Sequence, residues 1–246
     1  MKFRAHETFF IRKGWLRKGL KHVKEEPRIF VDRDINQTMK LGIGTNMVKS
    51  LRYWMQAVGL TNETRRDNFT VQEFTNFGDI VWKYDGYIEE EGTLWFLHYK
   101  LASNKELATT WYWFFNIFNV KVFTKDDFVN ALDGYVNYNI ESGEVAISSL
   151  EDDFTCLINT YIPRRKTHPE KVSPENTIDC PLGVLNLIDI IDSKKKFYKK
   201  VILRKESVHP LIIYAVMLDR YEKDESITNN EVKIASLLND SCNIGK

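Results

Sequence analysis

Apolar side chains near the start of the chain recur at helical spacing. Three of them share one face of a helix predicted over residues 14–25: Leu16, Leu20 and Val23. Pro27 is expected to end this helix, because proline disrupts a helix interior. A short second helix is predicted through residues 35–41. The chain therefore begins with a pair of helices.

The stretch LGIGTNMVKSLRYWMQAVGL predicts a tight turn and a longer third helix. Gly42 and Gly44 supply the turn. The buried stripe of the helix falls at i, i+3, i+7 and i+10, on Val48, Leu51, Met55 and Val58. Gly59 is expected to end the helix, and a pair of strands follows over residues 64–74.

This order of elements is typical of a winged helix-turn-helix, in which the longer helix reads DNA and the hairpin touches the backbone. The longer helix leaves several polar residues outside its stripe as candidate DNA contacts: Thr45, Asn46, Lys49, Arg52 and Tyr53. Arg65 and Arg66 lie where a wing would meet phosphates. The alternatives are a helical hairpin with a solvated polar face, or a protein-protein module.

Later apolar runs predict more helices and a second domain. Helices are expected from Thr93 onward and over the aromatic residues 111–118, which would close a first domain at about residue 120. The predicted fold class is mainly α with small β wings. It consists of a winged-helix domain over residues 1–120 and a mostly helical domain over residues 121–246.

The second half is expected to be helical with one strand. The predicted elements are helices over 125–138, 148–162, 208–221 and 228–238, a polar loop over 163–177 and a strand within 194–205. The lysines of KKKFYKK are interpreted as solvated. The last helices followed by CNIGK resemble a second helix-turn-helix that is cut short, so a truncated second winged helix is a further expectation.

Composition narrows the class of protein. With 43% hydrophobic and 28% charged residues, the chain is expected to be an ordinary soluble globular protein. It has no apolar run long enough for a membrane span and no apolar signal-peptide core near the start. Cys156, Cys180 and Cys242 form no CxxC pair, which favours reduced, structural cysteines and a cytoplasmic location.

Charge is unevenly distributed, although the net charge is only +1. Residues 1–66 hold 15 Lys and Arg against 6 Asp and Glu, whereas residues 67–100 hold 2 against 7. A basic segment followed by an acidic one predicts a polarised surface. The candidate phosphate-binding residues near the first helix are Arg12, Lys13, Arg17 and Lys18.

Candidate catalytic chemistry is sparse. The segment HETF offers His6 or Glu7 to act on an attacking water, although a buried or capping histidine is the more ordinary role. Asp85 and Glu89 belong to an acidic stretch that has enough oxygen atoms for Mg²⁺ or Mn²⁺, or that is simply solvated. The phosphate-loop, GxGxxG, HExxH and GxSxG motifs are all missing from the sequence.

Several long blocks resemble one bacterial family. The blocks are FRAHETFFIRKGWLRKGL, LGIGTNMVKSLRYWMQAVGL, EEGTLWFLHYKLAS, TTWYWFFN and DCPLGVLNLI. The family is known as a domain of unknown function and is encoded beside phosphoadenosine-phosphosulfate-reductase-like proteins.

The resemblance implies a role in bacterial DNA phosphorothioation and anti-phage defence. Similar members act as the DNA-nicking subunit of single-strand phosphorothioation systems of the Ssp type. The implied partners are double-stranded DNA, the reductase-like protein and an ATPase, and the implied cofactor is a divalent metal if the chain is catalytic. The alternatives are a non-catalytic DNA-binding recruiter and a transcriptional regulator.

Overall fold

The computed structural model describes residues 1–32, 34–139, 143–163, 180–192, 194–203 and 207–221. Its helices are α1 (Trp15–Glu25), α2 (Gln37–Leu41), α3 (Thr45–Ala57), α4 (Asn76–Tyr84), α5 (Glu91–Ser103), α6 (Thr109–Asn116), α7 (Lys125–Asn139), α8 (Ile147–Tyr161), the 3₁₀ helix η3 (Pro181–Leu185) and α9 (Pro210–Tyr221). Its strands are β1 (Thr61–Arg66), β2 (Phe69–Phe74), β3 (Val122–Phe123), β4 (Ile188–Asp192) and β5 (Phe197–Lys200).

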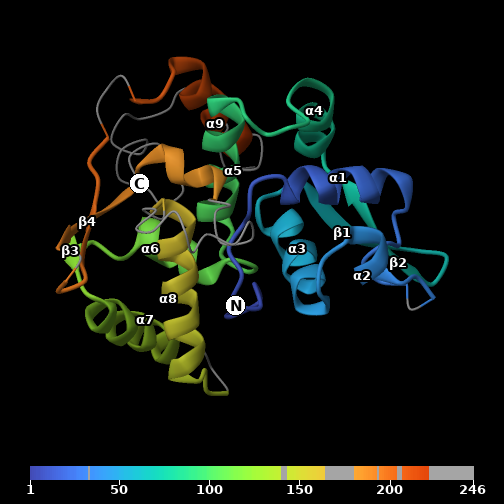
Figure 1. Cartoon of the computed structure of the whole chain (residues 1–246). Coiled ribbons are helices and arrows are strands. Elements are labelled where there is room, and N and C mark those ends of the chain that lie inside the picture. Colours follow the sequence, from blue (N-terminus) through green and yellow to red (C-terminus); the bar gives the residue numbers. More distant parts are fainter. Residues whose placement is uncertain (33, 140–142, 164–179, 193, 204–206, 222–246) are drawn as a thin grey trace, which may run out of the picture.

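The fold is mainly helical with small antiparallel sheets, as the sequence predicts. Within the described ranges, β1 and β2 form one sheet, and β3, β5 and β4 form another in that order. Figure 1 places α1, α2, α3 and the β1–β2 hairpin at one side, and α7, α8 and the β3–β5–β4 sheet at the other. No helix in the described part of the chain has the length and apolarity needed to cross a membrane.

Helix α1 packs closely against α3. The predicted apolar stripes of both helices are confirmed, since their members are buried: Leu16, Leu20 and Val23 on one side, and Val48, Leu51, Met55 and Val58 on the other. A Cβ atom at Gly19 would lie 2.5 Å from the Met55 sulfur, so a larger residue there would displace the Met55 side chain from its place between the helices. This contact fixes the position of the two helices that frame the basic surface described below.

The β1–β2 hairpin begins three residues earlier than the sequence indicated, at Thr61. Its strands pair from Thr61 with Phe74 to Arg66 with Phe69. Asp67 and Asn68 form the two-residue turn with φ values of 47° and 68°. Positive φ at both positions is the signature of a type I′ turn, which suits the right-handed twist of a hairpin.

Helix α4 was not predicted from the sequence. Thr75 caps it, because its hydroxyl oxygen accepts a hydrogen bond from the Gly78 N–H at 3.0 Å. Gly78 weakens the helical signal in the sequence, but packing requires it. A Cβ atom there would lie 2.0 Å from the carbonyl oxygen of Leu60.

An aromatic cluster fills the centre of the other side. Its α6 members Trp111, Trp113 and Phe114 are almost completely buried. The predicted division into two domains at residue 120 stays a prediction. Side chains on both sides of that point touch, since the ring centroids of Trp113 and Phe128 lie 5.1 Å apart. The two halves therefore share one hydrophobic core.

Two strands were missed in the second half, because β3 has only two residues and β4 exposes most of its apolar side chains. The predicted strand near residue 200 is confirmed as β5. The predicted helices over 125–138, 148–162 and 208–221 correspond to α7, α8 and α9. The predicted helix over 228–238, the truncated second winged helix and most of the polar loop over 163–177 lie outside the described residues.

His98 on α5 predicts a loss of stability in acid. Its Nδ1 lies 2.8 Å from the Tyr161 hydroxyl, and Phe115 and Trp95 pack against the ring. Burial penalises the charged ring and lowers the His98 pKa from 6.5 to about 3. The unfolded chain therefore binds a proton below pH 6.5 that the folded chain does not, so the free energy of unfolding falls as the pH falls.

The expected loss between pH 6.5 and pH 5 is about 2 kcal/mol. The figure of about 2 kcal/mol is an upper bound, because the His98 side chain is partly exposed to solvent. Urea unfolding at pH 7 and pH 5 measures it, with His98→Gln as the non-titrating control. The variant should lose less stability than the wild type over this interval, and an equal loss would contradict the assignment.

Candidate nucleic-acid interface

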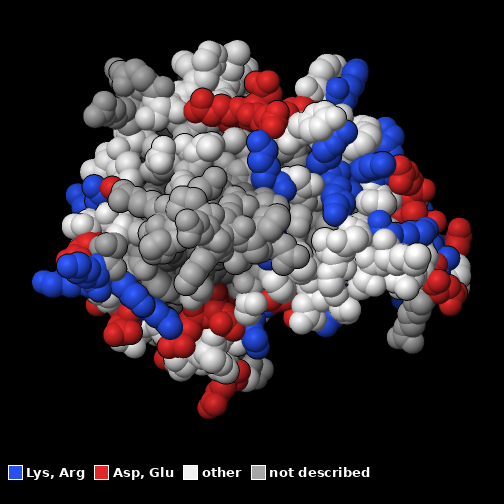
Figure 2. All heavy atoms as spheres, in the orientation of Figure 1, with Lys and Arg blue, Asp and Glu red and all other residues white. Residues whose placement is uncertain are grey.

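A basic hollow lies between α1 and the turn that joins α2 to α3. Its volume is ≈ 690 Å³, and its lining includes Arg12, Lys13 and Lys18 together with the turn residues Gly42 and Gly44. Figure 2 shows Lys and Arg side chains gathered over α1 and the loop before it, at the upper right of the molecule. Positive charge around a concave surface attracts polyanions.

The amino end of α3 opens beside this hollow. Gly44 is its N-cap residue, and no described side chain caps the first turn by a hydrogen bond. Thr45 begins the 13-residue helix. The first N–H groups of a helix carry partial positive charge and bind anions. The helix end and the surrounding cations therefore suit the same ligand, an anion such as a phosphate.

Each predicted phosphate-binding side chain near α1 has a definite environment. The Arg12 guanidinium lies over the rings of Phe9 and Trp15, at 5.6 and 5.3 Å from their centroids. The exposed ammonium of Lys13 lies 3.1 Å from Glu89 in an ion pair. Stacking positions Arg12 without neutralising its charge. Both side chains border the hollow.

Among the described residues, Lys18 and Arg17, unlike Arg12 and Lys13, both donate hydrogen bonds to backbone carbonyls of the protein. The Lys18 ammonium donates a hydrogen bond of 2.8 Å to the Leu41 carbonyl at the end of α2. The Arg17 guanidinium lies 3.5 Å from the Tyr87 ring centroid and donates a hydrogen bond of 3.1 Å to the Gly86 carbonyl. Lys18 still lines the hollow, whereas Arg17 ties α1 to the loop that precedes α5.

The first half of α3 presents three of the predicted DNA contacts to solvent. Thr45, Asn46 and Lys49 are all exposed and lie on one side of the helix. Lys49 lies 4.0 Å from Glu7 in a loose ion pair. In helix-turn-helix proteins, the residues at the start of the recognition helix contact base edges. The exposed trio occupies that position.

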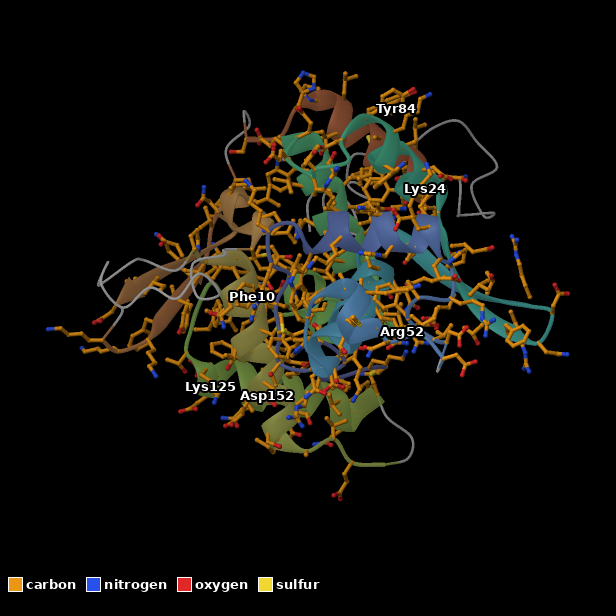
Figure 3. All side chains as sticks on the ribbon, turned by 45° about the vertical axis from the view of Figure 1, so that its right-hand side comes forward. Phe10, Lys24, Arg52, Tyr84, Lys125 and Asp152 are labelled. Atoms are coloured by element: carbon orange, nitrogen blue, oxygen red, sulfur yellow. The ribbon has the colours of Figure 1, made fainter. Side chains whose placement is uncertain are left out.

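Arg52 and Tyr53 lie in different surroundings from this trio. The Arg52 guanidinium donates two hydrogen bonds to the Glu63 carboxylate, of 2.5 and 2.8 Å, and so connects α3 to the hairpin (Figure 3). Tyr53 is only 9% exposed and packs against Trp54. Helical periodicity places both outside the apolar stripe, but the hairpin and the N-terminal segment cover them. Their assignment as DNA contacts stays a prediction.

The wing residues are exposed. Arg65 and Arg66 end β1 directly before the type I′ turn. Arg66 makes an ion pair of 2.7 Å with Glu73 across the hairpin, but its side chain remains 70% exposed. A surface ion pair of this kind contributes little to stability, so Arg66 can exchange Glu73 for a phosphate at small cost.

His6 lies at the centre of a buried hydrogen-bond network. Its Nε2 lies 2.8 Å from Asp153 on α8, and its Nδ1 accepts a hydrogen bond of 3.0 Å from the Thr8 N–H. Because Nδ1 accepts, the proton is on Nε2 and is donated to Asp153. The ring is 0% exposed and stacks on Trp54.

Asp153 was not identified from the sequence. Its carboxylate also accepts hydrogen bonds from the Arg4 N–H at 2.7 Å and from the Thr110 hydroxyl at 2.5 Å. Nothing local in the sequence signals this role, because 147 residues separate His6 from Asp153. Both nitrogens of His6 are therefore occupied within the protein. The catalytic assignment of His6 stays a prediction, and the geometry favours the buried-histidine alternative.

Glu7 is better placed than His6 to meet solvent. It is a partly exposed residue with a positive φ of 49°, and its carboxylate lies near Lys49 on the exposed side of α3. A carboxylate here would repel phosphate unless Lys49 neutralises it. The structure therefore places Glu7 beside the candidate DNA surface.

Asp85 and Glu89 lie in the same turn, and both carboxylates have partners. The Asp85 carboxylate accepts hydrogen bonds from the N–H groups of Glu89, at 3.0 Å, and Glu90, at 3.1 Å. The Glu89 carboxylate pairs with Lys13. These contacts hold the turn before α5 and connect it to the basic loop.

Comparison with known proteins shows which family the chain belongs to. The family model described as protein of unknown function (DUF4007) matches residues 3–246. The chain belongs to the DUF4007 family. No curated protein matches the chain.

Two solved structures resemble this DUF4007 chain over nearly its whole length. They are described as an SspB crystal structure and a magnesium ion-bound SspB crystal structure, with TM-scores of 0.82 and 0.83. Each is 27% identical, and the match covers 99% of this chain and 72% of the SspB chain. The resemblance noted from the sequence blocks is confirmed.

The magnesium ion in one SspB structure raises the question of whether this family member has a matching site. The described residues contain no group of three or more His, Cys, Asp or Glu side chains placed to hold a metal ion. Asp85 turns both oxygens toward backbone N–H groups, so Asp85 and Glu89 do not fit a metal in this arrangement. Their metal role stays a prediction.

Proposed function

We propose that this protein is the DNA-binding component of a bacterial DNA phosphorothioation system that serves anti-phage defence. Residues 1–74 would act as a winged helix-turn-helix on duplex DNA. The reductase-like protein and the ATPase implied by the family resemblance would act on the DNA that it holds.

One observation supports this proposal above the others. The basic hollow, the amino end of α3 without a side-chain cap and the exposed residues Thr45, Asn46 and Lys49 adjoin one another in the fold. Together they combine phosphate attraction with side chains able to reach base edges. The similarity to SspB agrees with the same system.

The parts of the surface would have separate roles. Arg12, Lys13 and the start of α3 would bind phosphates and fix the register of the helix on the duplex. Thr45 and Asn46 would contact base edges in the major groove. Arg65 and Arg66 would hold the adjacent backbone. Lys18 would hold the α2–α3 turn in shape through its bond to Leu41.

Strand nicking is the second candidate function, and the family resemblance favours it. Neither His6, which is enclosed, nor Asp85, whose oxygens are engaged, is arranged here to act on a phosphodiester. A nicking activity would therefore require other groups or a rearrangement on DNA. Glu7 is the predicted catalytic residue that lies nearest to the proposed DNA surface.

Salt-dependent binding tests the proposal. Duplex affinity is expected to fall steeply between 50 and 200 mM salt, with a slope of about −0.9 in log K for every phosphate bound. Fluorescence anisotropy with a labelled duplex of about 30 base pairs measures it. An affinity that does not change over this range would contradict the proposal. A supercoiled-plasmid assay with Mg²⁺, Mn²⁺ or EDTA, run on wild type and Glu7→Gln, tests nicking separately.

A further inference from the structure

The second half of the chain has the connectivity of another winged helix. In the three-stranded form of that fold, a short strand lies between the first two helices and pairs with the last strand of the hairpin that follows the third helix. Among the described residues, the sheet of the N-terminal unit has only β1 and β2, so that unit corresponds to the two-stranded form. Here β3 lies between α6 and α7, α8 follows, and β4 and β5 form the hairpin. The sheet order β3–β5–β4 places the short strand beside the last one, as this connectivity requires.

One aromatic cluster joins the three helices of this unit to β3 and β5. Phe128 of α7 packs against Trp113 of α6 and Phe154 of α8, with centroid distances of 5.1 and 5.0 Å. Tyr198 of β5 packs against Phe154 and against Phe123 of β3, at 5.5 and 5.9 Å. The hairpin is therefore built into the same core as the three helices.

The base of the hairpin is fastened to α6 by a second interaction. The Lys200 ammonium donates hydrogen bonds to the carbonyls of Phe114 and Phe118 at the end of α6. A cation at this end of a helix is favoured by the helix dipole. Two anchors, Tyr198 and Lys200, hold the base of the hairpin, so its tip projects from a rigid support.

The tip carries three consecutive exposed cations, Lys194, Lys195 and Lys196. Asp192, the nearest carboxylate in sequence, accepts hydrogen bonds from the N–H groups of Lys194 and Lys195, at 2.8 and 3.0 Å. Among the described residues, none of the three ammonium groups makes an ion pair, whereas Lys199 lower on the hairpin pairs with Asp189 at 3.2 Å. Figure 2 shows blue side chains projecting at the left edge, far from the α1 surface.

The helix in the recognition position of this unit is unsuited to DNA. Partly exposed carboxylates on α8 pair with other parts of the chain: Glu151 with Lys125 at 3.3 Å, and Asp152 with Arg4 at 2.8 Å. An acidic helix repels the phosphate backbone. If this unit meets DNA, the hairpin is the part with the right charge.

We infer that the β4–β5 hairpin is a second wing and that the lysines at its tip bind the phosphate backbone of DNA beside the duplex segment held by α3. This inference rests on the proposed function and adds a second DNA-binding surface to it. Lysines without base-reading partners give affinity but no sequence selection. The second wing would therefore lengthen the binding site without narrowing the sequence.

The separation of the two basic surfaces sets a minimum length of DNA. A folded chain of 246 residues has a radius of gyration of about 18 Å and a diameter on the order of 45 Å. That span corresponds to about 13 base pairs at 3.4 Å per pair. A duplex centred on α3 must therefore extend well beyond about 12 base pairs for the tip to reach it.

The test combines tip variants with two lengths of duplex. Lys194→Gln/Lys195→Gln/Lys196→Gln is compared with the triple Lys-to-Arg variant, which keeps the charges. On a duplex of about 30 base pairs, the Gln variant should bind about tenfold more weakly at low salt, and its salt slope should be shallower by about 1 to 3. The Arg variant should bind like the wild type. On a duplex of about 12 base pairs, all three proteins should bind alike.

Each outcome is decisive. Equal affinity of the Gln variant and wild type on the long duplex overturns the second wing and leaves the proposed function intact. An equally weakened affinity on both lengths overturns the flanking role, because the tip would then act at the α3 site or through the fold. Absence of any salt-sensitive binding by the wild type overturns both proposals. Thermal unfolding of the exposed-tip variants should match the wild type.

Discussion

Replacing Arg12, Lys13 and Lys49 together by glutamine is expected to weaken duplex binding by about 100-fold or more at 50 mM salt. Arg12 and Lys13 line the hollow, and Lys49 is exposed on the first half of α3. Each of them that binds a phosphate steepens the salt slope by about 0.9, so the variant should have a shallower slope. Lys18 is left intact, because its hydrogen bond to Leu41 supports the α2–α3 turn. Fluorescence anisotropy across a salt series measures both the affinity and the slope.

A charge-matched control makes this result specific. Lys2→Gln/Lys105→Gln/Lys125→Gln removes the same number of charges from positions outside both basic surfaces. If the control weakens binding as much as the Arg12, Lys13 and Lys49 variant, net charge rather than the hollow explains the affinity. A selective effect of the hollow variant would locate the duplex at the start of α3.

Replacing Asp153 by alanine is expected to lower the free energy of unfolding by about 3–5 kcal/mol. The change removes the acceptor of three hydrogen bonds, from the Arg4 N–H, His6 and the Thr110 hydroxyl. It leaves the donors of His6 and Thr110 buried without a partner. Asp152→Ala is the matched control at the neighbouring position, which Figure 3 shows on α8. Its pair with Arg4 is partly exposed, so the expected cost is at most about 1 kcal/mol.

Two further variants separate the structural from the catalytic role of His6. They are His6→Ala and the double variant His6→Ala/Asp153→Ala, and urea unfolding measures their stability beside Asp153→Ala and Asp152→Ala. If His6 has a structural role, the stability losses of His6→Ala and Asp153→Ala should not add up in the double variant, because both changes break the same buried network. If His6→Ala left stability unchanged but abolished plasmid nicking, the buried-network interpretation would fail and the catalytic prediction would gain support.

The order of the N-terminal elements could be predicted from the sequence, because it depends on local features such as apolar spacing and glycine positions. Apolar spacing fixed the faces of α1 and α3, and the predicted stripes are buried. Gly42 has a φ of 61°, which suits the glycine turn predicted between α2 and α3. Thr45, Asn46 and Lys49 at the start of α3 are exposed as predicted, since no described part of the chain covers them.

The sequence missed features that depend on distant packing. Gly78 argues against a helix by propensity, yet it lies within α4, where the Leu60 carbonyl oxygen approaches too closely for a residue with a Cβ atom. Arg52 and Tyr53 sit on the polar side of α3 by periodicity, but β1 and the N-terminal segment engage them. The lysines at residues 194–196 are exposed, as the sequence indicated, but only the sheet order places them at the tip of an anchored hairpin.

The sequence by itself determined the mainly helical class, the buried stripes, the concentration of positive charge near the start and the family. Those properties follow from local periodicity, composition and contiguous blocks of residues. Only the tertiary structure decided which polar side chains can contact a ligand and which are held inside the protein, because the partners that hold them lie far away in the chain. His6 shows the difference. Its residue type and its place near Arg12 suggest a catalytic role, whereas Asp153, 147 residues away, holds it in the core.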